Sequence, residues 1–229
     1  VFSALSVLLT KLVGEPLPRG EQKSALHDVS QGIKYVVQTP VIGGLIVLSI
    51  VPFLFGLSIN TLLPAFNIDI LAGGPDDLGF LMTSMGAGAI VGSLALAKMG
   101  EFRHKGRWLF LTGILWGFGV IWFANANTMI WALAGVAFTG LLSAINMSMN
   151  RSVVQLQVSQ DMRGRVMSID MMSHGLMPLG LLPISWIAEH YDVQIGLTVS
   201  GAVLAGLTVV LWLVLERVRR IDKGFERIN

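Results

Sequence analysis

The stretch that decides the fold is residues 39–68, TPVIGGLIVLSIVPFLFGLSINTLLPAFNI, which contains no Lys, Arg, Asp or Glu. A helix needs about 20 apolar residues to cross a hydrocarbon core of about 30 Å, and this stretch is longer. A soluble helix of this length would need a polar face, which is missing here. We therefore predict that this segment spans a membrane.

The rest of the chain has the same character. Of its 229 residues 53% are hydrophobic and only 13% are charged, whereas soluble domains carry about 25% charged residues. The apolar runs do not alternate with period two, and an open sheet would leave its edges unpaired in lipid. We therefore predict an all-α integral membrane protein. The predicted spans are residues 40–66, 78–98, 108–124, 128–149, 166–188 and 194–215.

The charged side chains predict the orientation. With six spans, all 16 basic residues fall on one side of the membrane, while the other side carries only acidic charges. Basic residues are retained on the cytoplasmic side, so both ends of the chain are predicted to be cytoplasmic. This distribution also argues against nucleic-acid binding. The basic residues are Lys11, Arg19, Lys23, Lys34, Lys98, Arg103, Lys105, Arg107, Arg151, Arg163, Arg165, Arg217, Arg219, Arg220, Lys223 and Arg227.

The chain divides into four predicted parts. Residues 1–13 resemble the end of a truncated transmembrane helix, and residues 14–39 form a cytoplasmic linker with an amphipathic helix. Residues 40–216 form the six-helix bundle, and residues 217–229 form a cytoplasmic basic tail. Six spans with cytoplasmic ends are typical of one half of a transporter built from two halves. We expect a missing N-terminal six-helix half as partner; the alternative is a second copy of this chain.

Enzyme signatures are absent from the sequence. It contains no H-E-x-x-H zinc motif, no G-x-x-x-x-G-K-[ST] phosphate loop and no G-x-S-x-G nucleophile elbow. It has no cysteine, which excludes disulfides and thiolate metal sites. We therefore expect no enzymatic activity, no metal and no cofactor. If the protein pumps a solute, the energy must come from an ion gradient.

Three stretches carry a family resemblance. The first runs from Leu63-Pro64 through a glycine-rich helix ending near Gly92, the second is GEFRHKGR at residues 100–107, and the third includes DMRGRVMS at residues 161–168. Together they resemble the major facilitator superfamily, and within it the bacterial exporters described as transmembrane secretion effectors, which include enterobactin-exporter-like proteins. The resemblance identifies the chain as helices seven to twelve, plus the end of helix six.

The resemblance implies a function. It implies a secondary transporter in the bacterial cytoplasmic (inner) membrane, in contact with lipid, that exports a small amphipathic molecule such as a siderophore or drug. We expect proton-coupled antiport by alternating access. The acidic residue of the family's loop motif is missing between Gly92 and Gly100. The alternative is therefore a non-transporting interaction or assembly module that retains the fold.

Asp170 and His174 are the strongest candidates for the proton pathway. They lie four residues apart and so share a helix face, and His174 lies roughly 15 Å into its span. Ionisable groups at such a depth usually face a cavity or a partner. The alternative is that Asp170 lies near the interface and pairs with Arg163 or Arg165, while His174 forms a hydrogen bond to a neighbouring helix.

Two asparagines are candidates for the substrate cavity. Asn60 and Asn146 lie in spans that, by the resemblance, line the central cavity, whereas Asn150 lies at the cytoplasmic edge. A buried amide needs a hydrogen-bond partner, so the alternative is that these side chains only join helices, at about 0.6 kcal/mol each.

The cytoplasmic loops supply candidates for gating. Asp161, Arg163 and Arg165 could form an ion-pair latch, or the arginines could only fix the topology. Gly164 between them suggests close approach or an unusual φ. The complete set is Arg103, Lys105, Arg107, Asp161, Arg163, Gly164 and Arg165.

Glycine, proline and tryptophan positions add expectations about packing. Glycines allow helices to approach closely, and prolines can kink a span. Close packing is expected at Gly86, Gly88, Gly92, Gly113 and Gly117, and kinks at Pro52, Pro64, Pro178 and Pro183. Interface anchors are expected at Trp108, Trp122, Trp131, Trp186 and Trp212. Trp116 lies deeper, and the sequence leaves open whether it lines the cavity or faces lipid.

Overall fold

The computed structural model describes residues 25–99 and 104–221, and the regular elements in these ranges are all helices. The predicted helix end at residues 1–13, the start of the linker and the tail beyond residue 221 lie outside the described residues. Within the described ranges, six segments are long and apolar enough to cross a membrane, which confirms the six predicted spans and the all-α membrane fold. They are Pro40–Asp69, Pro75–Lys98, Lys105–Ala124, Met129–Gln157, Gln160–His190 and Val193–Val214.

Four of the spans are continuous helices and two are interrupted. The first span consists of α3 (Pro40–Val51), the π-helical turn η1 (Pro52–Gly56) and α4 (Ser58–Asp69). The fifth consists of α8 (Gln160–Ser173), the 3₁₀ turn η2 (His174–Leu176) and α9 (Met177–His190). The continuous helices are α5 (Pro75–Met99), α6 (Lys105–Ala124), α7 (Met129–Gln157) and α10 (Val193–Val214).

The irregular turn η1 begins at Pro52, which has no backbone N–H to donate to the preceding turn. A local widening of the helix to the π form accommodates this loss. The carbonyl of Phe55 then accepts two hydroxyl groups, from Ser58 at 2.7 Å and from Ser200 on α10 at 2.7 Å. These bonds hold the irregular turn against α10 in the interior of the bundle.

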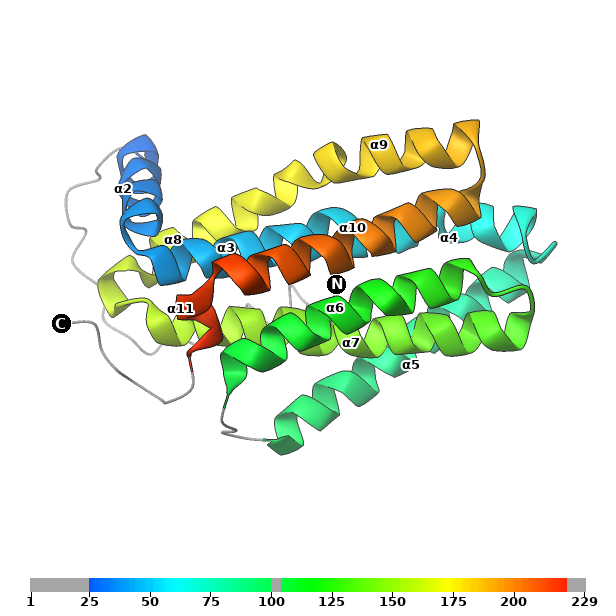
Figure 1. Ribbon diagram of the computed structural model, residues 1–229, viewed down its shortest axis with the longest axis horizontal. Coiled ribbons are helices and arrows are strands. Elements are labelled where there is room, and N and C mark those ends of the chain that lie inside the picture. The colour runs from blue at the N-terminus through cyan, green and yellow to red at the C-terminus, as the bar shows by residue number, and fades with distance from the viewer. Residues whose placement is uncertain (1–24, 100–103, 222–229) are drawn as a thin grey trace, which may run out of the picture.

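The helices run side by side along the long axis of the molecule (Figure 1). Helix α5 packs along α7, α7 packs along α6, and α6 packs along α10. At the other edge α9 lies beside α10. The short helix α2 (Ala25–Gln38) lies across one end of the bundle and packs on α8. Helix α11 (Glu216–Arg219) packs against α3 and α6 near the same end.

Glycines set the closest helix contacts, as expected from the sequence. A Cβ at Gly88 or Gly92 of α5 would overlap a backbone carbonyl of α7, and a Cβ at Gly117 would lie 2.6 Å from the Gly201 oxygen of α10. Gly113 faces Thr208. Gly86 differs from this group because a Cβ there would meet no atom within 4 Å, so close packing does not explain it.

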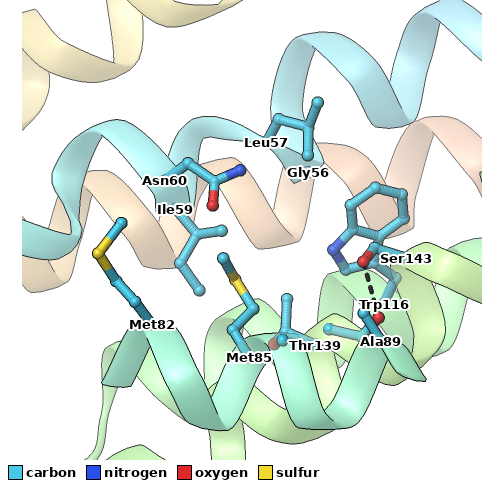
Figure 2. A pocket seen from close by; sticks show the side chains of 12 residues that line it. Gly56, Leu57, Ile59, Asn60, Met82, Met85, Ala89, Trp116, Thr139 and Ser143 are labelled. Atoms are coloured by element: carbon cyan, nitrogen blue, oxygen red, sulfur yellow. Dashed lines mark hydrogen bonds between the residues drawn. The ribbon is translucent and has the colours of Figure 1, made fainter. Parts of the chain in front are cut away.

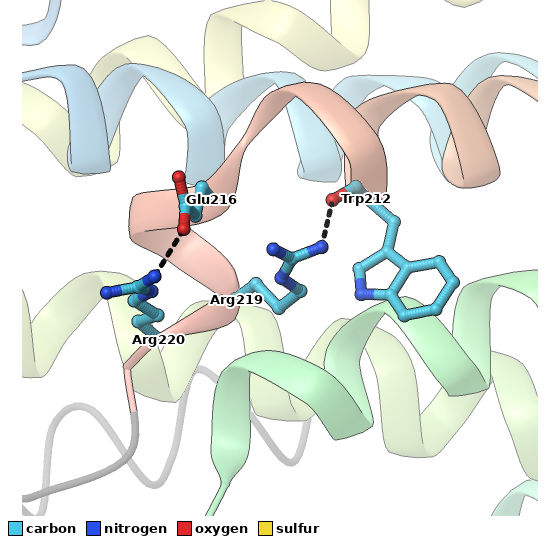
Figure 3. A network of polar contacts seen from close by, with 4 residues as sticks. All are labelled: Trp212, Glu216, Arg219 and Arg220. Carbon is cyan, nitrogen blue, oxygen red and sulfur yellow. Dashed lines mark hydrogen bonds and ion pairs between the residues drawn. The ribbon is translucent and has the colours of Figure 1, made fainter.

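The connections between helices differ in charge at the two ends of the long axis. The acidic end holds the α4–α5 and α9–α10 connections, where Asp192 caps α10 by accepting from the Gln194 N–H at 2.6 Å. The opposite end holds α2, α11 and the start of α8, whose sequences include the basic residues Lys34, Arg163, Arg217 and Arg219. At that end Arg220 pairs with Glu216 at 2.5 Å and Arg219 lies over the Trp212 ring (Figure 3).

Candidate functional site

Two side-chain contacts, one above the other, join the first and fifth spans. Ser49 on α3 donates its hydroxyl to Asp170 Oδ1 on α8 at 2.7 Å. Four residues later on each chain segment, the rings of Phe53 and His174 stack with centroids 4.1 Å apart. This ring stack joins η1 to η2, so the two irregular turns are in contact with each other. Both residues that the sequence singled out, Asp170 and His174, thus contact the first span.

The Asp170 carboxyl is buried, at 2% relative exposure. Among the described residues its hydrogen-bond donor is Ser49, and neither Arg163 nor Arg165 pairs with it. Arg165 directs a guanidinium nitrogen to the Met162 sulfur at 3.5 Å. In this arrangement no described arginine neutralises Asp170.

The asparagines occupy two kinds of environment. Asn146 is buried on α7 and donates to the Leu109 carbonyl at 2.8 Å and to the Thr112 hydroxyl at 2.9 Å on α6. Asn150 is also buried and donates to the Leu45 carbonyl on α3 at 3.2 Å. Both amides therefore join helices. Asn60 on α4 is exposed and lines a cavity.

This cavity, of about 230 Å³, lies between the first span and helices α5, α6 and α7 (Figure 2). Its wall is mostly apolar and includes no charged side chain. Thr139 and Ser143 line it, and each hydroxyl proton is donated to a carbonyl of α7 at 2.9 Å. The lining residues are Gly56, Leu57, Ile59, Asn60, Met82, Met85, Gly86, Ala89, Trp116, Thr139, Gly140 and Ser143.

Trp116 forms the inner wall of the cavity. Its side chain is fully buried, whereas the five tryptophans expected at interfaces are between 39% and 59% exposed. The indole packs against Gly56 of η1, where an added Cβ would lie 2.6 Å from the ring. The structure therefore resolves the question that the sequence left open. Met82 and Met85 were missed; their i, i+3 spacing beside Gly86 was the available signal.

The predicted gating residues lie at the basic end. Lys105 begins α6 and Arg107 is exposed on it, while Arg103 lies outside the described residues. Asp161 and Arg163 are exposed near the start of α8, and Asp161 forms no ion pair with another described residue.

Gly164 has no steric reason to be glycine in this conformation. A Cβ there would meet nothing within 4 Å, and its φ is not in the left-handed region. Neither close approach nor unusual φ, the two reasons suggested by the sequence, applies to the conformation described.

Comparison with known proteins identifies the same group as the sequence motifs. A family model described as transmembrane secretion effector matches residues 2–225. The chain is 27% identical over 164 residues to a staphyloferrin A transporter of Staphylococcus aureus (strain NCTC 8325 / PS 47), covering 72% of the chain and 41% of that protein. It is 24% identical over 224 residues to the multidrug efflux pump Tap of Mycolicibacterium fortuitum, covering 96% of the chain and 53% of the pump. The chain thus spans about half the length of the curated relatives it matches.

Proposed function

The chain belongs to the transmembrane secretion effector family of the major facilitator superfamily, and from this we propose that it forms half of a proton-driven exporter. The observation that carries the proposal is the buried Asp170 carboxyl, bonded to Ser49 between two interrupted spans. The relative named as a transporter supports transport, and the relative named as an efflux pump supports export. The substrate is a small amphipathic molecule bound in a cavity that a second six-helix half completes.

Proton exchange at Asp170 would change the contact between the first and fifth spans. The ionised carboxylate accepts the Ser49 proton, whereas the protonated carboxyl can also donate. Helix α3 carries no charged side chain, Lys34 on the adjoining α2 is exposed, and the nearest titratable group along α8–η2 is His174. One proton therefore changes the net charge of this buried contact by one, in surroundings where charge is costly.

The irregular turns η1 and η2 would allow this charge change to move the helices. Irregular turns within spans are common at functional sites because they allow the two helical parts to move separately. Here η1 and η2 lie one helical turn from the Ser49–Asp170 bond and touch through Phe53 and His174. Protonation would shift α8 against α3, and the turns would transmit the shift to α9 and α4. In this way proton entry would alternate with substrate release.

We further propose a place in the bacterial cytoplasmic (inner) membrane with the basic end in the cytoplasm. The segregation of the basic side chains to one end supports this orientation. The partner is a second six-helix half, from a longer chain or from a second copy of this one. Both arrangements would set the open side of the cavity against the added helices.

The test is proton-driven flux in proteoliposomes containing the full-length protein. With an imposed pH gradient, the wild-type protein should move a fluorescent amphipathic substrate against its concentration gradient. Asp170→Asn should abolish this uphill flux while substrate exchange without a proton gradient persists, because asparagine preserves the shape of the side chain and removes the carboxyl group that would carry the proton. Asp76→Asn, an exposed carboxylate at the opposite end, is the matched control and should behave as wild type.

Two results would contradict the proposal. Normal uphill flux by an Asp170→Asn, His174→Ala double variant would remove Asp170 from the coupling step. Absence of flux by the wild-type protein across a broad substrate panel would favour the non-transporting membrane module instead.

A further inference from the structure

The cavity contains a buried hydrogen-bond donor with no acceptor. Trp116 Nε1 is fully buried and has no hydrogen-bond partner among the described residues. Figure 2 shows the indole nitrogen turned toward the space between Asn60 and Met85. An unsatisfied buried donor loses its hydrogen bond to water without a replacement, so native proteins rarely retain one without a reason. A ligand that brings an acceptor oxygen would replace the lost hydrogen bond.

We propose that this cavity binds an uncharged, apolar ring system of the exported molecule through an acceptor oxygen that receives the Trp116 Nε1–H bond. The proposal rests on the proposed transport function and specifies the substrate class: neutral aryl ketones, amides or ethers. It assigns to Trp116 a specificity role in direct contact with the substrate.

The volume and flexibility of the cavity fit such a group. At about 230 Å³ it exceeds the roughly 150 Å³ that accommodates benzene in an engineered protein cavity. It is smaller than the roughly 300–1,000 Å³ of complete ligand pockets, so it takes one part of a drug-sized molecule. Met82 and Met85 line one wall on α5, and unbranched thioether side chains adapt to ligands of different shape.

The absence of charged side chains from the wall argues against ionised ligand groups at this position. The lining includes no Lys, Arg, His, Asp or Glu, so a carboxylate or an ammonium group would be buried without a counter-charge. The Thr139 and Ser143 hydroxyls already donate within α7. That leaves Trp116 as the inner donor and the exposed Asn60 amide as the outer polar contact.

Benzophenone is a suitable probe because it is apolar, uncharged and has a single carbonyl oxygen. On irradiation the excited ketone takes a hydrogen atom from a nearby C–H bond and the two resulting carbon radicals combine. Radiolabelled benzophenone would be irradiated with membranes containing the full-length protein, and modified residues would be mapped by peptide mass spectrometry. We expect modification at Met82 or Met85. An aryl diazirine without an oxygen serves as the matched probe for apolar access.

Trp116→Phe removes the N–H and retains an aromatic ring. It should lower benzophenone labelling of Met82 and Met85 roughly three- to ten-fold, the range expected for one hydrogen bond, while diazirine labelling persists. Trp122→Phe on the same helix, where the native ring is 39% exposed, should change neither. Gly86→Leu should block both probes, because its side chain would fill the cavity and a Cβ there meets nothing within 4 Å. Gly206→Leu, equally unobstructed on α10, is its control.

Unchanged benzophenone labelling in Trp116→Phe would overturn the proposed hydrogen bond, and unchanged labelling in Gly86→Leu would overturn the cavity as the binding site. Loss of both probes in Trp116→Phe would also overturn the specific bond, because apolar access alone would then explain the labelling. These results are independent of flux. Labelling as expected in a protein that moves no solute would refute the transport proposal and leave the binding site standing.

Discussion

Asn60 and Asn146 have the same amide side chain, but one is exposed at the cavity and the other is buried between helices. Asn146 is surrounded by protein and satisfies two acceptors on α6, whereas Asn60 faces the cavity from an exposed position. In a membrane protein an interhelical hydrogen bond contributes about 0.6 kcal/mol on average and about 1.7 at most. The two side chains should therefore differ in what their removal costs.

Asn146→Ala should lower the free energy of unfolding by about 1 kcal/mol and leave the apparent substrate affinity unchanged, since the side chain does not line the cavity. Asn60→Ala should leave the free energy of unfolding unchanged and weaken the apparent substrate affinity, because one polar contact with the substrate is lost. Thermal unfolding in detergent and concentration-dependent flux measure the two effects. The assignment fails if both variants change the same quantity.

At the scale of elements, the contact between α5 and α7 depends on residues without side chains. Gly88 and Gly140 both allow a backbone carbonyl of the opposite helix to approach where a Cβ would otherwise lie. A backbone oxygen cannot rotate away as a flexible side chain can. Relief therefore requires the two helices to separate, and separation also forfeits the neighbouring contacts.

Gly88→Ala should therefore destabilise the protein toward the upper end of the roughly 1–3 kcal/mol seen for overpacked interiors. Gly86→Ala, two residues away on the same helix, should be neutral or stabilising, because its Cβ meets open space and alanine is the better helix former by about 1 kcal/mol. The midpoints of thermal unfolding of the two variants compare the effects directly. Equal midpoints would mean that the helices adjust more easily than this packing indicates.

The sequence predicted the elements better than their irregularities. Apolar length and one-sided charge were enough for six spans, because both act on whole segments. Of the four expected proline kinks, Pro52 begins a π turn and Pro178 follows a 3₁₀ turn, while Pro64 and Pro183 lie within α4 and α9. A proline removes one hydrogen bond, but the neighbouring helices decide whether the chain widens there.

The site was predictable to the extent that spacing decides it. Asp170 and His174 were proposed as a pair because four residues return to the same helix face, and both contact the first span. The direction of Asn146 depends on how α7 is rotated against α6, and the cavity at Trp116 depends on Gly56 from a distant span. Such contacts between separate helices have no local signal in the sequence.

The whole molecule is polarised, with the acidic connections at one end and the basic helices at the other (Figure 1). If the basic end is cytoplasmic, as the rule for Lys and Arg predicts, the α4–α5 connection faces the outside and the start of α6 faces inward. This chain contributes no cysteine. A single introduced cysteine therefore reports the side of the membrane on which its own residue lies.

Asp76→Cys at the start of α5 should react with a membrane-impermeant maleimide in intact cells, because Asp76 is exposed at the acidic end. Arg107→Cys, exposed on α6 at the basic end, should react only after the membrane is permeabilised. Blocking each position first with a permeant maleimide controls for differences in reactivity. The reverse pattern would invert the molecule in the membrane and place the Ser49–Asp170 contact nearer the outer surface.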